Sequence, residues 1–143
     1  GTVLDAATAA AVIEAGADFV VSPVFDRDTV SVCRESGVVV APGAFTPTEI
    51  VAAWRAGADL VKVFPATALG PQFVRDVRGP LPEVRLMPTG GVTVGNARDF
   101  LAAGAACVGL GTALVDAEAV EAGDWAAIEA RARRLVESLD GLS

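Results

Sequence analysis

The sequence has no histidine and no tyrosine, and Lys62 is the one lysine among its eleven basic residues. The lack of histidine excludes Ser–His–Asp and Cys–His triads and removes the commonest zinc ligand. The two cysteines, Cys33 and Cys107, match no CxxC pattern. We interpret them as buried free thiols of a cytosolic protein, in preference to a disulfide or a reactive thiol. The groups left for chemistry are one amine, carboxylates, arginines, hydroxyls and backbone amides.

Basic clusters and long apolar runs are also missing. No apolar run reaches the ~20 residues of a membrane helix, and residues 1–10 lack the charged start and apolar core of a secretory signal. The net charge of −7 and the pI of about 4.4 disfavour nucleic acid, although a locally positive site can still take a small anion. We therefore expect a cytoplasmic protein that binds neither nucleic acid nor membrane. With 52% hydrophobic residues, we expect 1–143 to form one domain.

A weak internal repeat predicts the order of helices and strands. In each copy an alanine-rich helix ends, a glycine follows and a β-branched apolar run begins; the copies are "EAGADFVVSP" (14–23), "RAGADLVKVFP" (55–65) and "AAGAACVGLG" (102–111). Glycine at such a junction suits the positive φ that closes a helix. Proline or glycine after most apolar runs marks strand ends. We expect strands near 18–22, 38–41, 60–64, 84–87 and 106–110, and helices near 5–15, 27–35, 48–56, 71–78, 94–103 and 124–138.

Strands that are apolar throughout and alternate with helices predict a parallel sheet covered on both faces. A spacing of roughly 20–25 residues per βα unit fits a (β/α)8 TIM barrel or an open doubly wound sheet. About five of the eight units of a barrel are visible, and "GTVL" at 1–4 resembles the end of a strand. The expected fold is therefore α/β of the TIM-barrel type, here a partial barrel without the N-terminal strands.

Lys62 lies within "LVKVF", where the two-residue period of a strand places its side chain on one face with Leu60 and Phe64. A lysine there can be structural, reaching water at a strand edge or pairing with a buried carboxylate. However, arginine supplies every other basic side chain and serves ion pairs equally well. Lysine alone can lose its proton and attack a carbonyl, and burial lowers its pKa. The pattern favours a Schiff-base lysine.

Two glycine-rich segments follow the last two expected strands. They are "PTGGVT" (88–93) and "GLGTAL" (109–114), in which Gly111 and Thr112 open a short helical turn. Glycines at strand ends let backbone amides approach an anion, and barrels often hold phosphate at the loops after strands seven and eight. Each segment alone could be only a tight turn. Together they predict an anion site, to which Thr89 and Thr112 add hydroxyl donors.

The motifs "KVFPA" (62–66), "PTGG" (88–91) and "GLGTAL", preceded by "GTVL", "SP" and "PGAFTPTE", resemble one enzyme family. It comprises the aldolases that cleave 2-keto-3-deoxy-6-phosphogluconate (KDPG) and 4-hydroxy-2-oxoglutarate (KHG). The resemblance runs in order over nearly the whole chain. It implies a class I, Schiff-base lyase on a (β/α)8 barrel, usually a homotrimer, that takes a phosphorylated keto acid and releases pyruvate with no metal or cofactor.

The resemblance also implies roles for particular residues. Lys62 would form the imine with pyruvate or the keto acid, and Thr2 and Pro23 would lie near the pyruvate moiety. The set implied for the keto-acid and phosphate region is Thr89 with the backbone of Gly90 and Gly91, and Thr112 beside Gly111 for the phosphate.

One part of the family pattern is missing. The family carries a catalytic glutamate and a nearby arginine on an earlier strand, in a stretch similar to "EVTLR", and no such stretch occurs here. None of the eight glutamates lies at an expected strand end, and Glu49 fits a capping box in "TPTE" (46–49). A positioned acid or base contributes about 10²–10⁴-fold. We therefore expect this chain alone to be at least about a hundredfold slower than a form with that strand, and to self-associate through an open sheet edge.

Two other interpretations remain open at this point. A phosphate-binding barrel similar to thiamin-phosphate synthase shares the glycine loops but does not need a lone strand lysine followed by Phe-Pro-Ala. A chain without the catalytic glutamate could instead bind a phosphorylated ligand and catalyse nothing. Neither the sequence motifs nor the composition separates gluconate, galactonate and hydroxyoxoglutarate substrates.

Overall fold

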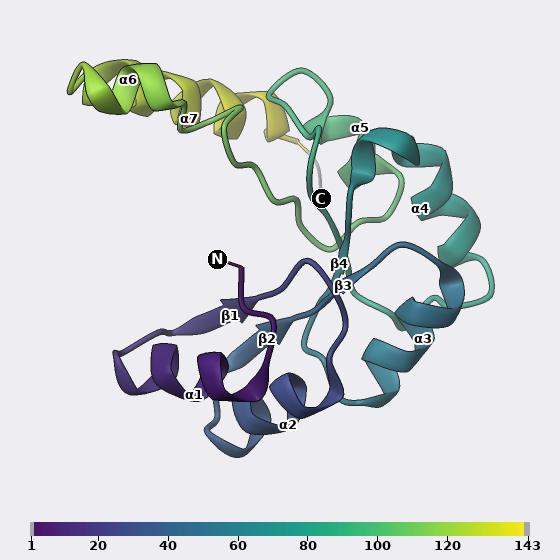
Figure 1. Ribbon diagram of the computed structural model, residues 1–143. Helices are drawn as coiled ribbons and strands as arrows, with labels where there is room; N and C mark the ends of the chain where they lie inside the picture. The colour runs from purple at the N-terminus through teal and green to yellow at the C-terminus, as the bar shows by residue number, and fades with distance from the viewer. Residues whose placement is uncertain (1, 142–143) are drawn as a thin grey trace.

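Helices and strands alternate along the chain in the computed structural model, which describes residues 2–141 (Figure 1). The strands are β1 (Phe19–Val21), β2 (Val39–Ala41), β3 (Gly43–Ala44), β4 (Val61–Val63) and β5 (Leu86–Pro88). The helices are α1 (Ala6–Glu14), α2 (Arg27–Glu35), α3 (Pro47–Arg55), the 3-10 turn η1 (Ala66–Ala68), α4 (Gly70–Arg78), α5 (Ala97–Ala102), α6 (Ala117–Glu121) and α7 (Trp125–Leu139).

Every strand pair is parallel, as the apolar runs predict. One sheet has the order β1-β2 and the other β3-β4-β5. Pro42 separates the two sheets because it has no N–H to donate to a ladder. Its carbonyl still accepts from the Lys62 amide at 2.9 Å. The chain from β2 to β3 therefore passes between β1 on one side and β4 on the other, and the strands lie side by side in sequence order.

Two predicted segments differ from the structure. The strand expected at 38–41 continues past Pro42 as β3, and the strand expected at 106–110 is reduced to a single parallel bridge between Thr89 and Gly109. The segment does lie beside β5, since the amides of Ala106 and Gly109 donate to β5 carbonyls at 2.9 Å. A Cβ on Gly109 would stand 2.4 Å from Thr89 Oγ1, so the contact requires glycine, which weakens a regular strand. Helices η1 and α6 were not expected.

The local helix signals are confirmed. The Glu49 carboxylate accepts from the Thr46 amide at 2.8 Å, and the Thr46 hydroxyl accepts from the Glu49 amide at 3.3 Å, which completes the capping box of α3. Gly16, Gly57 and Gly104, which follow α1, α3 and α5, have φ of 94°, 96° and 99°. These glycines turn the chain from each helix toward the next extended segment.

The helices α1 to α5 follow one another around an arc, with the strands on its inner side (Figure 1). One hydrophobic cluster joins β3, β4 and β5 to α3, α4 and α5, and includes the fully buried Ile50, Val74 and Leu86. A smaller cluster joins β1 and β2 to α1 and α2 around Val30. Both cysteines are free; Cys33 is buried in the second cluster and Cys107 is half-buried.

Helices α6 and α7 extend away from this arc (Figure 1). No residue of α7 is fully buried, although Leu135 and Leu139 pack against the larger cluster. Arg98 of α5 donates to the backbone carbonyl of Ser138 at 2.8 Å, and Arg131 pairs with Asp116 at the start of α6. Among the described helices, none is both long and apolar enough to cross a bilayer.

We expect Gly43→Ala to destabilise the fold by at least about 2 kcal/mol, because overpacking against backbone cannot be relieved by a side-chain rotation. A Cβ at Gly43 would stand 2.1 Å from the Pro23 carbonyl oxygen. Gly79→Ala is the matched control: it has an ordinary helical φ of −52°, and its added Cβ meets its nearest atom at 3.5 Å. Urea unfolding measures both, and equal midpoints would contradict the predicted contact.

Candidate active site

Lys62 lies in the middle of β4, paired in register with Gly43 of β3 and Met87 of β5. Its side chain is only 8% exposed. Its Nζ lies 4.4 Å from the centroid of the Phe64 ring, which is on the same face of β4 two residues further on. The predicted burial of the single lysine within an apolar strand is therefore confirmed.

Burial lowers the pKa of the Lys62 amine below its ordinary value of 10.5, because the charged form loses water and gains no anion in return. The ion pairs found among residues 2–141 are Arg131–Asp116 and Arg133–Glu129, both remote in sequence from β4. Because its pKa is lowered, a larger share of the Lys62 amine is neutral at a given pH than for an ordinary lysine. The neutral amine is the form that attacks a carbonyl.

The two glycine-rich segments meet at one cavity of about 480 Å³ at the carboxyl ends of the strands. Its lining is Phe64, Thr89, Gly90, Gly91, Val92, Thr93, Gly111, Thr112 and Ala113. The structure thus brings together all five residues predicted for the keto-acid and phosphate region. Within the described chain, the amides of Gly90, Gly91, Gly111 and Thr112 donate to no protein acceptor. Unpaired amides that converge on one cavity suit an anion.

Side-chain hydrogen bonds hold the first of these loops in shape. Thr67 donates to the Gly90 carbonyl at 3.2 Å, and the Asn96 amide group donates to the Gly91 carbonyl at 3.0 Å while accepting from the Thr93 amide at 2.8 Å. Gly90 and Gly91 have φ of 81° and 79°, which disfavours any other residue. The carbonyls of Gly90 and Gly91 are therefore engaged, whereas their amides have no acceptor in the described chain.

A second, smaller cavity of about 270 Å³ also has Phe64 in its lining. Pro23, Gly43, Phe45 and Glu49 line it together with Phe64. Pro23 therefore lies close to the strand position beside Lys62, since Gly43 is the register partner of Lys62 and would touch Pro23 through an added Cβ.

Thr2 lies apart from the other candidates. It is exposed, and the amide of its neighbour Val3 donates to the Val21 carbonyl at 3.5 Å, which places Thr2 beside the end of β1. It does not line either of the two cavities next to Phe64. A direct role for Thr2 near a bound keto acid stays a prediction.

Glu49 acts as a helix cap. Its carboxylate accepts from the amides of Phe45 and Thr46 at 2.8 Å, and these bonds, with that of Phe45 first, hold the pKa of Glu49 below its ordinary value. A carboxylate kept ionised in this way is a poor proton donor near neutral pH. Its position in the smaller cavity therefore does not make it a general acid.

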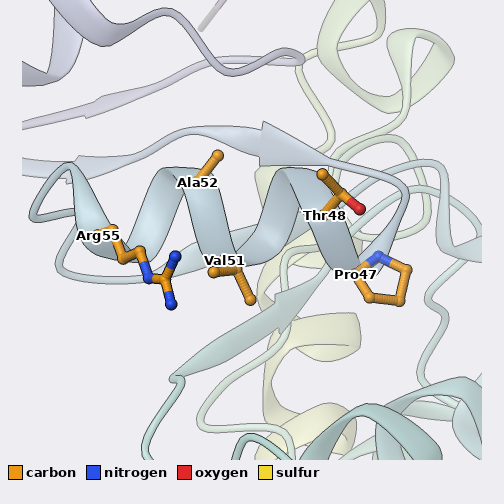
Figure 2. Close-up of a pocket in the computed structure, with 5 residues that line it drawn as sticks. All are labelled: Pro47, Thr48, Val51, Ala52 and Arg55. Atoms are coloured by element: carbon orange, nitrogen blue, oxygen red, sulfur yellow. The ribbon is translucent and has the colours of Figure 1, made fainter.

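A third hollow, of about 450 Å³, lies on the outer face of α3 (Figure 2). Its lining residues come from this one helix: Pro47, Thr48, Val51, Ala52 and Arg55. None of them is a candidate for binding or catalysis. No group of three or more potential metal ligands occurs in the part of the chain that the structure describes.

Sequence reasoning assigned no role to three side chains at the candidate site. Phe64 contacts the candidate amine, and Thr67 and Asn96 shape the glycine loop. The two-residue period of β4 already placed Phe64 on the face of Lys62, so its contact could have been found. Thr67 and Asn96 gave no such signal, because their partners lie in a loop whose path the sequence does not specify.

The arrangement defines a class of protein: parallel α/β, with a strand lysine and two phosphate-type glycine loops at the carboxyl ends. A family profile described as "KDPG and KHG aldolase" matches residues 1–131. The chain belongs to this family.

Individual relatives agree with the family match. The chain is 40% identical over 139 residues to the 2-dehydro-3-deoxy-phosphogluconate aldolase of Pseudomonas aeruginosa, covering 96% of this chain and 63% of that protein. A solved structure described as "Native KDPGal structure" superposes with a TM-score of 0.90 at 30% identity, covering 99% of this chain and 68% of the other. Another solved structure is KDPG aldolase from Legionella pneumophila with pyruvate captured as a covalent carbinolamine intermediate. It superposes with a TM-score of 0.82 at 31% identity, covering 90% of this chain and 63% of the other. The chain thus spans just under two thirds of the curated relative's length.

We expect phosphate and small phosphate esters to bind at the free amides of Gly90, Gly91, Gly111 and Thr112. Thr112→Val should weaken binding roughly tenfold, since a hydrogen bond to a charged group contributes about 1.5–3 kcal/mol. Gly91→Val should weaken it further, because φ is 79° and an added Cβ would stand 2.6 Å from Thr67 Oγ1.

Titration of 15N-labelled protein with glycerol 3-phosphate, followed by amide chemical shifts, measures both affinities. Thr48→Val on the outer face of α3 is the matched control and should bind like the parent chain. Unchanged affinity in Thr112→Val and Gly91→Val would place the anion elsewhere.

Proposed function

We propose that this protein is a class I aldolase that uses Lys62 to form an imine with 2-keto acids, as its family membership suggests. The observation that carries the proposal is the single lysine, buried on β4, with its amine at the carboxyl ends of the strands and its pKa lowered by burial. The proposed reaction is cleavage of KDPG to pyruvate and glyceraldehyde 3-phosphate, or of KHG to pyruvate and glyoxylate.

The chemistry follows from the properties of the amine. The neutral Lys62 amine adds to the keto carbon, and loss of water gives a protonated imine. A base removes the proton of the C4 hydroxyl, the C3–C4 bond breaks, and its electron pair moves toward the imine nitrogen to give an enamine. The aldehyde leaves, the enamine takes a proton at carbon, and water releases pyruvate and restores the amine. The imine nitrogen is the electron sink.

The larger cavity suits the phosphate end of the substrate. Its free amides and the Thr112 hydroxyl donate to no acceptor in the described chain, and none of its lining residues is charged. Lys62 does not line this cavity, but its Nζ lies 4.4 Å from the centroid of the Phe64 ring, and Phe64 does line it. We propose that Thr89, Gly90 and Gly91 lie along the keto acid between these two ends. Pro23 and Thr2, at the end of β1, would lie on the pyruvate side.

The broader architecture is part of the proposal. The parallel strands, in sequence order and with helices on their outer side, are consistent with a single domain that is part of a (β/α)8 barrel. The homotrimer that the resemblance implies and the cytoplasmic location expected from the composition stay predictions. A synthase of thiamin phosphate is disfavoured, because it does not account for the buried lone lysine and the family match points elsewhere.

We expect pyruvate and borohydride to leave a stable adduct on Lys62 that peptide mass spectrometry can locate. Lys62→Arg should abolish the adduct, because arginine keeps the charge but cannot lose its proton. The rate of adduct formation should rise with pH and level off below the ordinary lysine value of 10.5, since the amine is fully neutral above its lowered pKa.

Arg55→Lys supplies the control, because it adds an exposed lysine on the outer face of α3. In that variant the adduct should stay on Lys62. Modification of both lysines at similar rates, or an adduct only on the α-amino group, would overturn the proposed role.

A further inference from the structure

Phe64 lies where three features of the candidate site meet. It is the one described residue that lines both the larger and the smaller cavity, and its ring also lies 4.4 Å from Lys62 Nζ. The two cavities therefore both adjoin Phe64, and the Lys62 amine lies over its ring. Phe64 is part of the motif "KVFPA" (62–66), but the sequence pattern assigns no role to its ring.

The ring also has a physical effect on the amine. Burial penalises the ammonium form, and the described chain brings no carboxylate to it. The face of an aromatic ring carries negative electrostatic potential and attracts a cation. Phe64 and burial therefore act in opposite directions on the protonation of Lys62, and the ring offers the one favourable electrostatic contact that offsets the loss of water.

Gly90 fixes the position of that ring. A Cβ on Gly90 would stand 3.0 Å from Cε2 and 3.2 Å from Cδ2 of Phe64, so the glycine backbone packs directly on the ring edge. Gly90 also lines the larger cavity. The loop that offers amides to an anion is thus the same loop that holds the ring in place beside the amine.

We propose that Phe64 is a positioning residue that acts through Lys62: its ring face holds the amine beside the residue that adjoins both cavities and stabilises the ammonium form there. The relevance to catalysis rests on the proposed function, in which Lys62 forms the imine. The contact itself needs no substrate and can be tested without one.

The other groups around the amine leave the Phe64 ring as the main specific influence on the pKa of Lys62. The register neighbours of Lys62 on β3 and β5, Gly43 and Met87, are uncharged, and so are the loops at 89–93 and 109–113. The titratable group that lines a cavity next to Phe64 is Glu49, whose carboxylate is engaged by the amides of Phe45 and Thr46.

The single lysine makes the test direct. Protein labelled with 13C at lysine Cε has one such side-chain resonance, whose chemical shift against pH reports the pKa of Lys62. In Phe64→Leu, which keeps an apolar side chain but removes the ring face, we expect this pKa to fall by roughly 0.5 to 1, from the strength of a cation–π contact. Phe64→Tyr is the matched control, and its pKa should stay close to that of the parent.

A second series covers the case in which Phe64→Leu does not fold. Phenylalanines with one, two or three ring fluorines, placed at position 64 alone, weaken the negative ring face with little change of shape. The pKa of Lys62 should fall in steps with fluorine number. An unchanged or raised pKa in Phe64→Leu, or a flat fluorine series, would overturn the proposal.

The same variants separate this inference from the proposed function. Trapping with pyruvate and borohydride should reach its plateau at a lower pH in Phe64→Leu, by the same interval as the pKa. If the parent chain forms no adduct at any pH, the imine proposal fails, while the resonance titration still decides the contact between Phe64 and Lys62.

Discussion

The parallel direction of the strands is the constraint on which the candidate site depends. Because β3, β4 and β5 run the same way, their carboxyl ends and the loops that follow meet at one edge of the sheet. Lys62 is brought beside loops at 89–93 and 109–113 by this pairing alone. The core beneath includes the fully buried Ile50 and Leu86 and keeps the strands in register. Packing away from the amine therefore determines where the amine lies.

The site combines an apolar environment for the amine with a polar environment for an anion, separated by one aromatic ring. Lys62 is largely shielded from water, whereas Gly90 and Gly111, whose amides are free, line an open cavity. An arginine at position 62 would keep its proton in both environments. The proposed chemistry therefore depends on Lys62, which can exist as a neutral amine or as an ammonium ion. It also depends on Phe64, whose ring is proposed to stabilise the ammonium form.

Much of this could be predicted from the sequence, and the misses have physical causes. The buried strand around Lys62 and the capping box of Thr46 and Glu49 follow from short-range patterns. The convergence of the two glycine loops follows from the predicted parallel sheet. The strand end at Pro42 was predicted, but the continuation beyond it as β3 and the single bridge at Gly109 were not, because both depend on which segment lies alongside. The hydrogen bonds of Asn96 were also missed, since they depend on a loop path that no periodicity encodes. The role of Thr2 stays a prediction.

The docking of α7 has a consequence for how the molecule opens. This helix has no fully buried residue and is held by the edge contacts of Leu135 and Leu139, by the bond from Arg98 to Ser138 and by the pair of Arg131 with Asp116. Regions with few buried contacts open at a fraction of the global free energy of unfolding. The amide hydrogens of α7 should therefore exchange with solvent well before those of β4. The C-terminal helix would then be a separate cooperative unit, whose release leaves the strand that carries the amine intact.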